Sequence, residues 1–199
     1  MLTTINDHFR SIAARVEFRH KIERSDFLGI AFPIADEDQF FAELNAVEKK
    51  HFDATHHCWA FRFFRDSRAR SADAGEPSGT AGRPILSAIE GADLFDVAVV
   101  VVRWFGGVKL GTGGLSRTYR DTAAETLRRA EIVDHYVYDR VRVVVPFERL
   151  SDVYRLVEPP AIVLVEERFG ETNEFAFDVR RSRRDEFTRT LAARRLTLR

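Results

Sequence analysis

The sequence has a single cysteine, Cys58, among its 199 residues. One cysteine excludes an internal disulfide framework and leaves no pair of thiols for a zinc or redox motif. Long apolar runs are also missing, since the longest, VAVVVV at 97–102, is far shorter than the roughly 20 residues that span a bilayer. The N-terminal residues lack the apolar stretch and cleavage pattern of a signal peptide. We therefore expect a cytoplasmic protein that makes no membrane contact.

The chain has no net charge, because 31 basic residues balance 31 acidic residues. No overall field draws it toward nucleic acid, so any such binding needs a local patch. One candidate patch is the C-terminal stretch 180–199, which carries eight arginines against two acidic residues. This density suggests an RNA-binding surface. Arginine is nevertheless the usual cation of this chain, at 27 residues against four lysines, and an ordinary exposed helix face would look the same.

Hydrophobic periodicity predicts an α+β protein with two domains, 1–136 and 137–199. In the first domain we expect strands at 16–25, 27–34, 57–64 and 96–105, helices at 36–51 and 115–130, and a polar loop at 65–84. The first of these helices is amphipathic, and its predicted buried stripe holds Phe40, Phe41, Leu44 and Val47. In the second domain we expect strands at 138–147, 161–169, 173–181 and 195–198, with helices at 148–157 and 183–193. This order is that of a small split-βαβ sandwich.

The segment RWFGGVKLGTGGLSRTY, residues 103–119, holds five glycines between an apolar strand and a predicted helix. A Walker phosphate loop would require lysine where Thr112 stands, so an ATPase loop is rejected. The dinucleotide fingerprint fits poorly, because Ser116 occupies the place of its third glycine. What survives is a helix start near Gly114 and Leu115, whose free backbone N–H groups favour an anion.

The candidate anion- or RNA-binding residues are accordingly Arg103, Gly106, Gly107, Lys109, Gly111, Gly113, Gly114 and Arg117. The competing interpretation is that these glycines supply positive φ angles or close backbone approach and bind nothing. Residue chemistry alone favours this second interpretation.

Two further stretches carry reactive side chains. The first, ATHHCWAF, contains His56, His57 and Cys58, and adjacent histidines on a strand point to opposite faces, so they do not share one metal ion unaided. Cys58 has a base two residues away, but burial is the usual fate of a lone cysteine among aromatic residues. The second, DAGEPSGTAG, supplies Asp73 and Glu76, which suit an acid and base pair, a metal site or, the interpretation we favour, capping of backbone N–H groups in a turn-rich loop. We predict neither a metal nor a cofactor.

Four stretches in this order, RSDFLGIAFPI, ATHHCWAF, GEPSGTAGRPIL and VVVVRWFGGVKLGTGGLSRTY, resemble the IMPACT family, whose bacterial members are called YigZ. The resemblance covers residues 20–130, and the rest is similar to the smaller C-terminal domain of the bacterial members. It implies an N-terminal domain similar to domain IV of elongation factor G, followed by a ferredoxin-like sandwich. It also implies a link to translation, because eukaryotic members are regulators of translation. Those members act through an additional N-terminal domain that this sequence lacks.

These observations support two functional hypotheses. The first is a non-enzymatic protein that binds RNA, the ribosome or a translation-associated protein through the glycine segment, with a role in the regulation of translation. The alternative is a small hydrolase acting on an anionic substrate, with His56 and either Asp73 or Glu76 as catalytic groups. The second hypothesis requires these three side chains to converge in one pocket. The sequence leaves the oligomeric state open.

Overall fold

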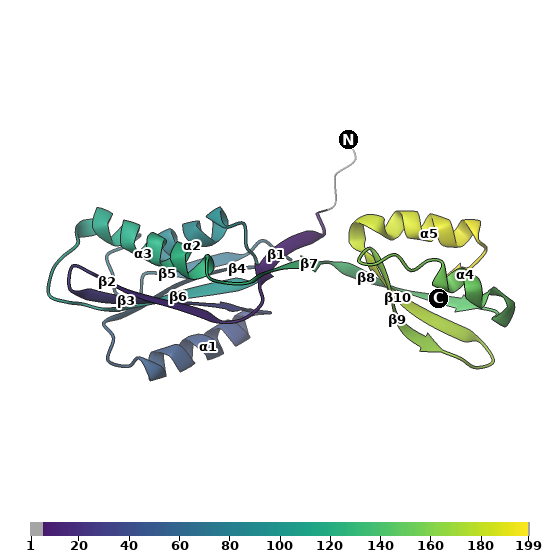
Figure 1. The fold of residues 1–199 in the computed structure, drawn as a ribbon, viewed down its shortest axis with the longest axis horizontal. Coiled ribbons are helices and arrows are strands. Elements are labelled where there is room, and N and C mark those ends of the chain that lie inside the picture. The colour runs from purple at the N-terminus through teal and green to yellow at the C-terminus, as the bar shows by residue number, and fades with distance from the viewer. Residues whose placement is uncertain (1–5, 199) are drawn as a thin grey trace. The chain divides into compact units, whose positions relative to one another are not determined.

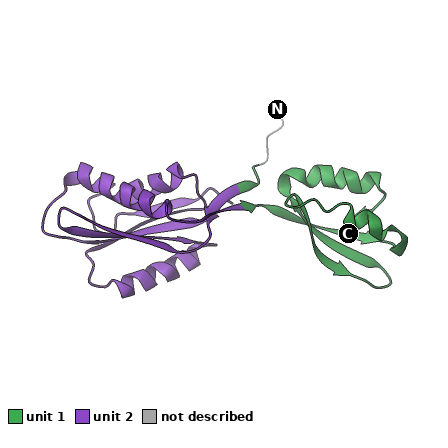
Figure 2. Cartoon of the chain, viewed as in Figure 1, with its two compact units in different colours: residues 1–8, 135–199 green, residues 9–134 purple. Residues whose placement is uncertain are grey.

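The computed structural model describes residues 6–198 and divides into two units (Figure 2). One unit is Phe9–Asp134, and the other takes the remainder of the described chain on both sides of it. The sequence interpretation ended the first domain at 136 and placed the residues before Phe9 within it. The two units are described separately below.

The unit Phe9–Asp134 is built on a five-stranded antiparallel sheet (Figure 1). Its strand order is β2 (Val16–Ile22), β3 (Ser25–Pro33), β6 (Val97–Trp104), β4 (His56–Arg62) and β5 (Ala69–Ala72). The apolar run of β6 is central and buried on both faces, because Val97, Val99 and Val101 join one core cluster while Ala98, Val100 and Val102 join the other. A continuous run of β-branched residues suits a strand that is covered on both sides.

Helices cover both faces of this sheet (Figure 1). Helix α1 (Glu37–Lys50) packs on one face, and α2 (Gly82–Gly91) with α3 (Gly111–Leu127) packs on the other. The Asp36 side chain caps α1 by accepting a hydrogen bond from the Gln39 backbone. Phe40, Leu44 and Val47 are buried as predicted, whereas Phe41 is 40% exposed and meets the edge of Trp59 instead. Phe41 lies one residue round the helix from the buried stripe, where the sheet no longer covers it.

Three local features differ from the sequence prediction. The predicted loop 65–84 contains the short edge strand β5, and the first turn of α2 lies at its end. Strand β5 has the sequence ARSA, which shows no apolar alternation because no residue of it is fully buried. Helix α3 begins at Gly111, before the predicted start near Gly114, because the low helix propensity of glycine hides the first turn from the pattern.

The second unit has the order β8 (Tyr138–Val145), α4 (Leu150–Tyr154), β9 (Ile162–Arg168), β10 (Asn173–Arg180), α5 (Arg184–Ala193) and β11 (Thr197–Leu198). Short 3-10 turns at Phe147–Arg149 and Arg181–Arg183 lead into the two helices. The four strands form an antiparallel sheet in the order β11-β8-β10-β9. Separately, β1 (His8–Ile12) pairs with β7 (Ile132–Tyr136) in a two-stranded sheet. The molecule is thus a mixed α+β protein, as predicted. No helix within residues 6–198 is long and apolar enough to cross a membrane.

The C-terminal arginines do not form a free basic surface. Arg180 donates to the buried carboxylate of Asp7 at 2.5 Å, and this pairing holds the pKa of Asp7 at about 2 against the opposing effect of burial. Arg181 and Arg184 both pair with Asp139. The ion-pair partners of Arg183 are Glu158 and Glu186. Half of the eight arginines in 180–199 are therefore neutralised within their own unit, which weakens the interpretation of this stretch as an RNA-binding patch.

Candidate functional site

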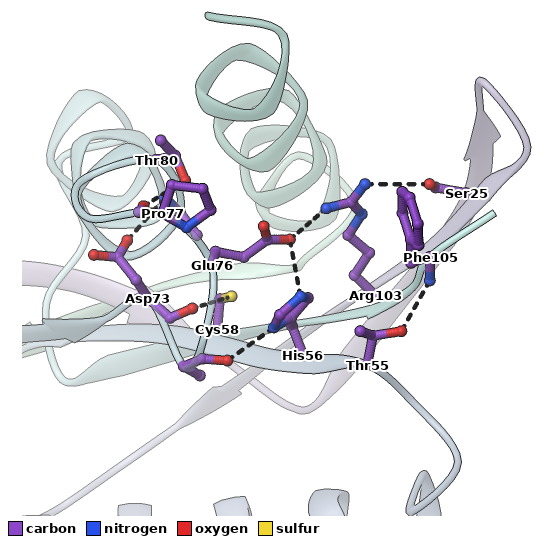
Figure 3. A network of polar contacts seen from close by, with 12 residues as sticks. Ser25, Thr55, His56, Cys58, Asp73, Glu76, Pro77, Thr80, Arg103 and Phe105 are labelled. Atoms are coloured by element: carbon purple, nitrogen blue, oxygen red, sulfur yellow. Dashed lines mark hydrogen bonds and ion pairs between the residues drawn. The ribbon is translucent and has the colours of Figure 1, made fainter. Parts of the chain in front are cut away.

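The carboxylate of Glu76 lies at the centre of a buried polar cluster (Figure 3). Its side chain is 3% exposed, and its Oε1 atom accepts hydrogen bonds from Arg103 Nη1 at 2.6 Å and from the Tyr119 hydroxyl at 2.8 Å. The Nε2 atom of His56 lies 3.8 Å from the same oxygen. Ser25 completes the set by accepting from Arg103 Nη2 at 3.3 Å. We refer to Ser25, His56, Glu76, Arg103 and Tyr119 as the Glu76 cluster.

Strand register explains why these side chains meet. His56 of β4 stands directly opposite Arg103 of β6, so the two share the sheet face that α2 and α3 cover. Cys58, two residues along β4, lies on the same face. His57 turns to the other side, where its Nε2 contacts the His51 carbonyl at 3.1 Å. The two adjacent histidines therefore serve different environments.

The Arg103 guanidinium is 4% exposed and lies near the rings of Phe27 and Phe105, with its central carbon 5.4 and 5.3 Å from their centroids. Burial of a guanidinium is costly unless a carboxylate pairs with it, and Glu76 supplies that partner. Its Nε atom has no hydrogen-bond partner among the described residues. Arg103, which the sequence interpretation counted among the anion-binding residues, is thus already engaged by a carboxylate.

Asp73 has a structural role in the loop before α2. One carboxylate oxygen accepts from the backbone N–H groups of Ala81 and Gly82, both at 2.9 Å, and the other accepts from Gly79 at 2.8 Å. Partial burial opposes ionisation of Asp73, but these donors outweigh it and hold its pKa below the usual range. A carboxylate that caps three backbone groups is not free to act as an acid or base. The capping interpretation therefore describes Asp73, whereas Glu76 belongs to the buried cluster.

Cys58 is fully buried, and its Sγ donates to the Asp73 carbonyl at 2.9 Å. Burial raises the pKa of this thiol to about 12. The thiolate is the nucleophilic form of cysteine, so Cys58 does not carry the chemistry that the nearby histidine suggested.

Alkylation tests the state of Cys58. At pH 8 the native protein is expected to react with iodoacetamide far more slowly than the urea-unfolded protein, because both burial and the raised pKa suppress the thiolate. Mass spectrometry of samples quenched over time measures the modified fraction. Equal rates for the native and unfolded protein would show that Cys58 is accessible and ionised.

An open pocket of about 420 Å³ lies beside the Glu76 cluster. Its wall is formed by Thr55, His56, Gly75, Glu76, Pro77, Arg103, Phe105, Lys109, Leu110, Gly111, Thr112 and Leu115. The pocket therefore joins the buried carboxylate to the start of α3. That helix start has no side-chain cap at Leu110 and no acidic residue in its first turn, so its first N–H groups remain available. Lys109 is exposed beside them.

The structure brings some of the predicted residues together and separates others. Arg103, Lys109 and Gly111 line the pocket with His56 and Glu76, the two groups of the alternative catalytic hypothesis. The remaining predicted residues lie outside its wall: Gly106, Gly107, Gly113, Gly114 and Arg117. Two glycines of the segment, Gly107 and Gly111, have φ angles of +84° and +71°.

Sequence reasoning missed Phe105, Tyr119 and Ser25 as members of the site. Tyr119 was assigned only to the buried stripe of a helix, although its hydroxyl needs a partner when it is buried. Ser25 and Phe105 gave no signal, because their roles depend on the pairing of β3 with β6. Within residues 6–198, no cluster of three or more His, Cys, Asp or Glu side chains is placed to hold a metal ion.

Comparison with known proteins identifies relatives over most of the chain. The model of the Impact N-terminal domain matches residues 23–127. An IMPACT family member from Thermus thermophilus is 43% identical over 155 residues, which cover 78% of this chain and 84% of that protein. YvyE of Bacillus subtilis is 32% identical, with 77% and 71% covered. A solved crystal structure of a hypothetical protein is 25% identical with a TM-score of 0.69 over 98% of this chain and 97% of that one. As its motifs predicted, the chain belongs to the IMPACT family.

Proposed function

We propose that this protein is a binding protein that holds a phosphate of RNA, free or in the ribosome, and takes part in the regulation of translation in the cytoplasm. The observation that carries the proposal is the uncapped start of α3, which opens into the pocket beside Lys109. A helix N-terminus with free N–H groups attracts phosphate through those donors and through the helix dipole. The translational role is supported by membership of a family whose eukaryotic members regulate translation.

Binding is preferred over catalysis because the reactive groups of the site are already engaged. Glu76 accepts from both Arg103 and Tyr119, Asp73 caps a loop, and Cys58 is a buried thiol. The hydrolase alternative is supported by one observation, the 3.8 Å separation of His56 Nε2 and Glu76 Oε1. Turnover of a generic phosphate ester that is abolished by His56→Ala would favour the alternative.

We further propose that the two units are the domains implied by the resemblance, with the second beginning near residue 137. The βαββαβ order and the strand order β11-β8-β10-β9 support a ferredoxin-like sandwich for the second unit. For the first unit, a layer of sheet between α1 and the α2–α3 pair supports a domain similar to domain IV of elongation factor G.

Salt dependence tests the phosphate contacts. Binding of a short single-stranded RNA should weaken linearly on a log–log plot, with a slope of about −0.7 for each phosphate contacted. Removing two contacts by Lys109→Ala with Arg117→Ala should lower the affinity and make the slope shallower by about 1.4. Fluorescence anisotropy over a salt series measures both quantities.

A matched control uses Lys49→Ala with Lys50→Ala, which removes the same charge from exposed positions at the end of α1. Helix α1 covers the opposite face of the sheet, so affinity and slope should stay near the unmodified values. If the α3 pair and the α1 pair change RNA binding equally, the assignment of the site to the start of α3 is wrong.

A further inference from the structure

We propose that the pocket selects ribonucleotides, with Glu76 accepting a hydrogen bond from the 2′-hydroxyl and Phe105 stacking on the base. This inference rests on the proposed binding of RNA and names the part of the nucleotide that the pocket reads. The sequence interpretation treated Glu76 only as a loop cap or as a catalytic group.

The first observation is the unequal use of the two carboxylate oxygens of Glu76. The contacts from Arg103, Tyr119 and His56 all reach Oε1, and within the described chain no hydrogen bond reaches Oε2. Figure 3 shows this second oxygen directed away from His56 and Arg103. A carboxylate with a 3% exposed side chain that lines a pocket thus keeps one acceptor without a partner. A buried acceptor of this kind is stabilised by a ligand that brings a donor.

Pairing with Arg103 makes this acceptor compatible with an anionic ligand. The buried guanidinium balances the charge of Glu76, so the pocket does not present a net negative wall to phosphate. The donors for phosphate lie along the pocket wall at Gly111 and Thr112, with Lys109 beside them. A ligand that fills the pocket must therefore carry both a hydroxyl or amine donor and an anionic group. A ribonucleotide has both, whereas a deoxyribonucleotide lacks the 2′-hydroxyl.

The second observation is Phe105, which is 45% exposed although it lines the pocket. Its backbone N–H donates to Thr55 Oγ1 at 3.0 Å, and the Arg103 guanidinium carbon lies 5.3 Å from its ring centroid. The ring is thus positioned from one side and free on the other. Aromatic rings in this situation stack on unpaired bases without strong preference for one base. A volume of about 420 Å³ admits one extruded nucleotide and excludes a duplex, so we expect a single-stranded ligand.

Three matched oligonucleotides test the inference on the unmodified protein. Short single-stranded RNA, DNA of the same base sequence and the 2′-O-methyl form of the RNA are compared by fluorescence anisotropy at one salt concentration. RNA is expected to bind on the order of tenfold more tightly than the other two, because a hydrogen bond to a charged group is at stake. The 2′-O-methyl form retains the ribose oxygen but has no proton to donate, so it should behave like DNA.

Two variants separate the hydroxyl contact from stacking. Glu76→Gln should reduce the preference for RNA over DNA, provided that its tryptophan fluorescence and thermal unfolding show a folded protein. Phe105→Ala should weaken RNA and DNA alike, on the order of tenfold. Phe52→Ala is the control, since Phe52 is 84% exposed and does not line the pocket.

The outcomes distinguish this inference from the proposed function. Equal affinity for RNA and DNA, both weakened by Lys109→Ala with Arg117→Ala, would overturn the inference and leave phosphate binding in place. Unchanged affinity in Phe105→Ala would overturn the stacking contact. If none of the three oligonucleotides binds, the proposed function and this inference both fail.

Discussion

Replacing Arg103 with methionine is expected to destabilise the unit Phe9–Asp134 by about 3–5 kcal/mol. The substitution keeps the side chain long and apolar but leaves the Glu76 carboxylate in a nearly closed site, where Tyr119 is its remaining donor. An uncompensated buried charge costs far more than the intact ion pair contributes. Urea unfolding followed by tryptophan fluorescence measures this unit specifically, because both tryptophans, Trp59 and Trp104, lie within it.

The control is the double variant Glu76→Leu with Arg103→Met, which removes both charges. Its loss of stability should be smaller than the sum of the two single losses, by roughly 2 kcal/mol or more, because neither variant charge is then left alone. Additive losses would show that the two side chains do not depend on each other in the folded protein. An Arg103→Met protein as stable as the unmodified one would contradict the buried ion pair itself.

Replacing Gly106 with alanine is expected to cost about 3 kcal/mol in the same assay. A Cβ atom built at this position lies 2.0 Å from the Arg24 carbonyl oxygen and 2.2 Å from its carbon. Both are backbone atoms at the turn between β2 and β3, so the strain is not relieved by a change of rotamer. The Gly106 N–H also donates to Ser25 Oγ at 3.2 Å, so a shift of this backbone would disturb a member of the Glu76 cluster.

Gly113→Ala is the matched control within the same glycine segment. A Cβ atom at Gly113 meets nothing within 4 Å, and the position lies inside α3. Alanine there should leave stability unchanged or raise it by up to about 1 kcal/mol, because alanine is the better helix former. If Gly106→Ala and Gly113→Ala have the same effect, close packing does not explain Gly106.

The glycine segment illustrates how far sequence reasoning reaches. Neither nucleotide signature fitted it, and the structure gives the individual glycines different roles. Gly106 permits close backbone approach, and Gly107 and Gly111 adopt positive φ angles, while Gly113 has no such constraint. The competing interpretation that the glycines serve the backbone therefore describes three of these four positions. Spacing alone does not distinguish them, because each requirement is set by a segment distant in the sequence.

Local patterns by themselves determined several features of this protein. The run 97–102 identified the central strand, since only a strand covered on both faces is apolar at every position. The lone cysteine among aromatic residues indicated burial, and four motifs identified the family. These features follow from short-range chemistry, which the order of residues carries directly.

The tertiary structure alone decided the composition of the site. The pairing of β4 with β6 sets His56 opposite Arg103, the loop before α2 brings Glu76 over them, and α3 adds the Tyr119 hydroxyl. Their separations along the chain, 27 residues for Glu76 to Arg103 and 43 for Glu76 to Tyr119, exceed any local period. The same geometry turned Arg103 from a candidate surface contact into the partner of a buried carboxylate. A buried charge requires an opposite charge wherever the fold can supply one, and only the folded chain reveals which residue that is.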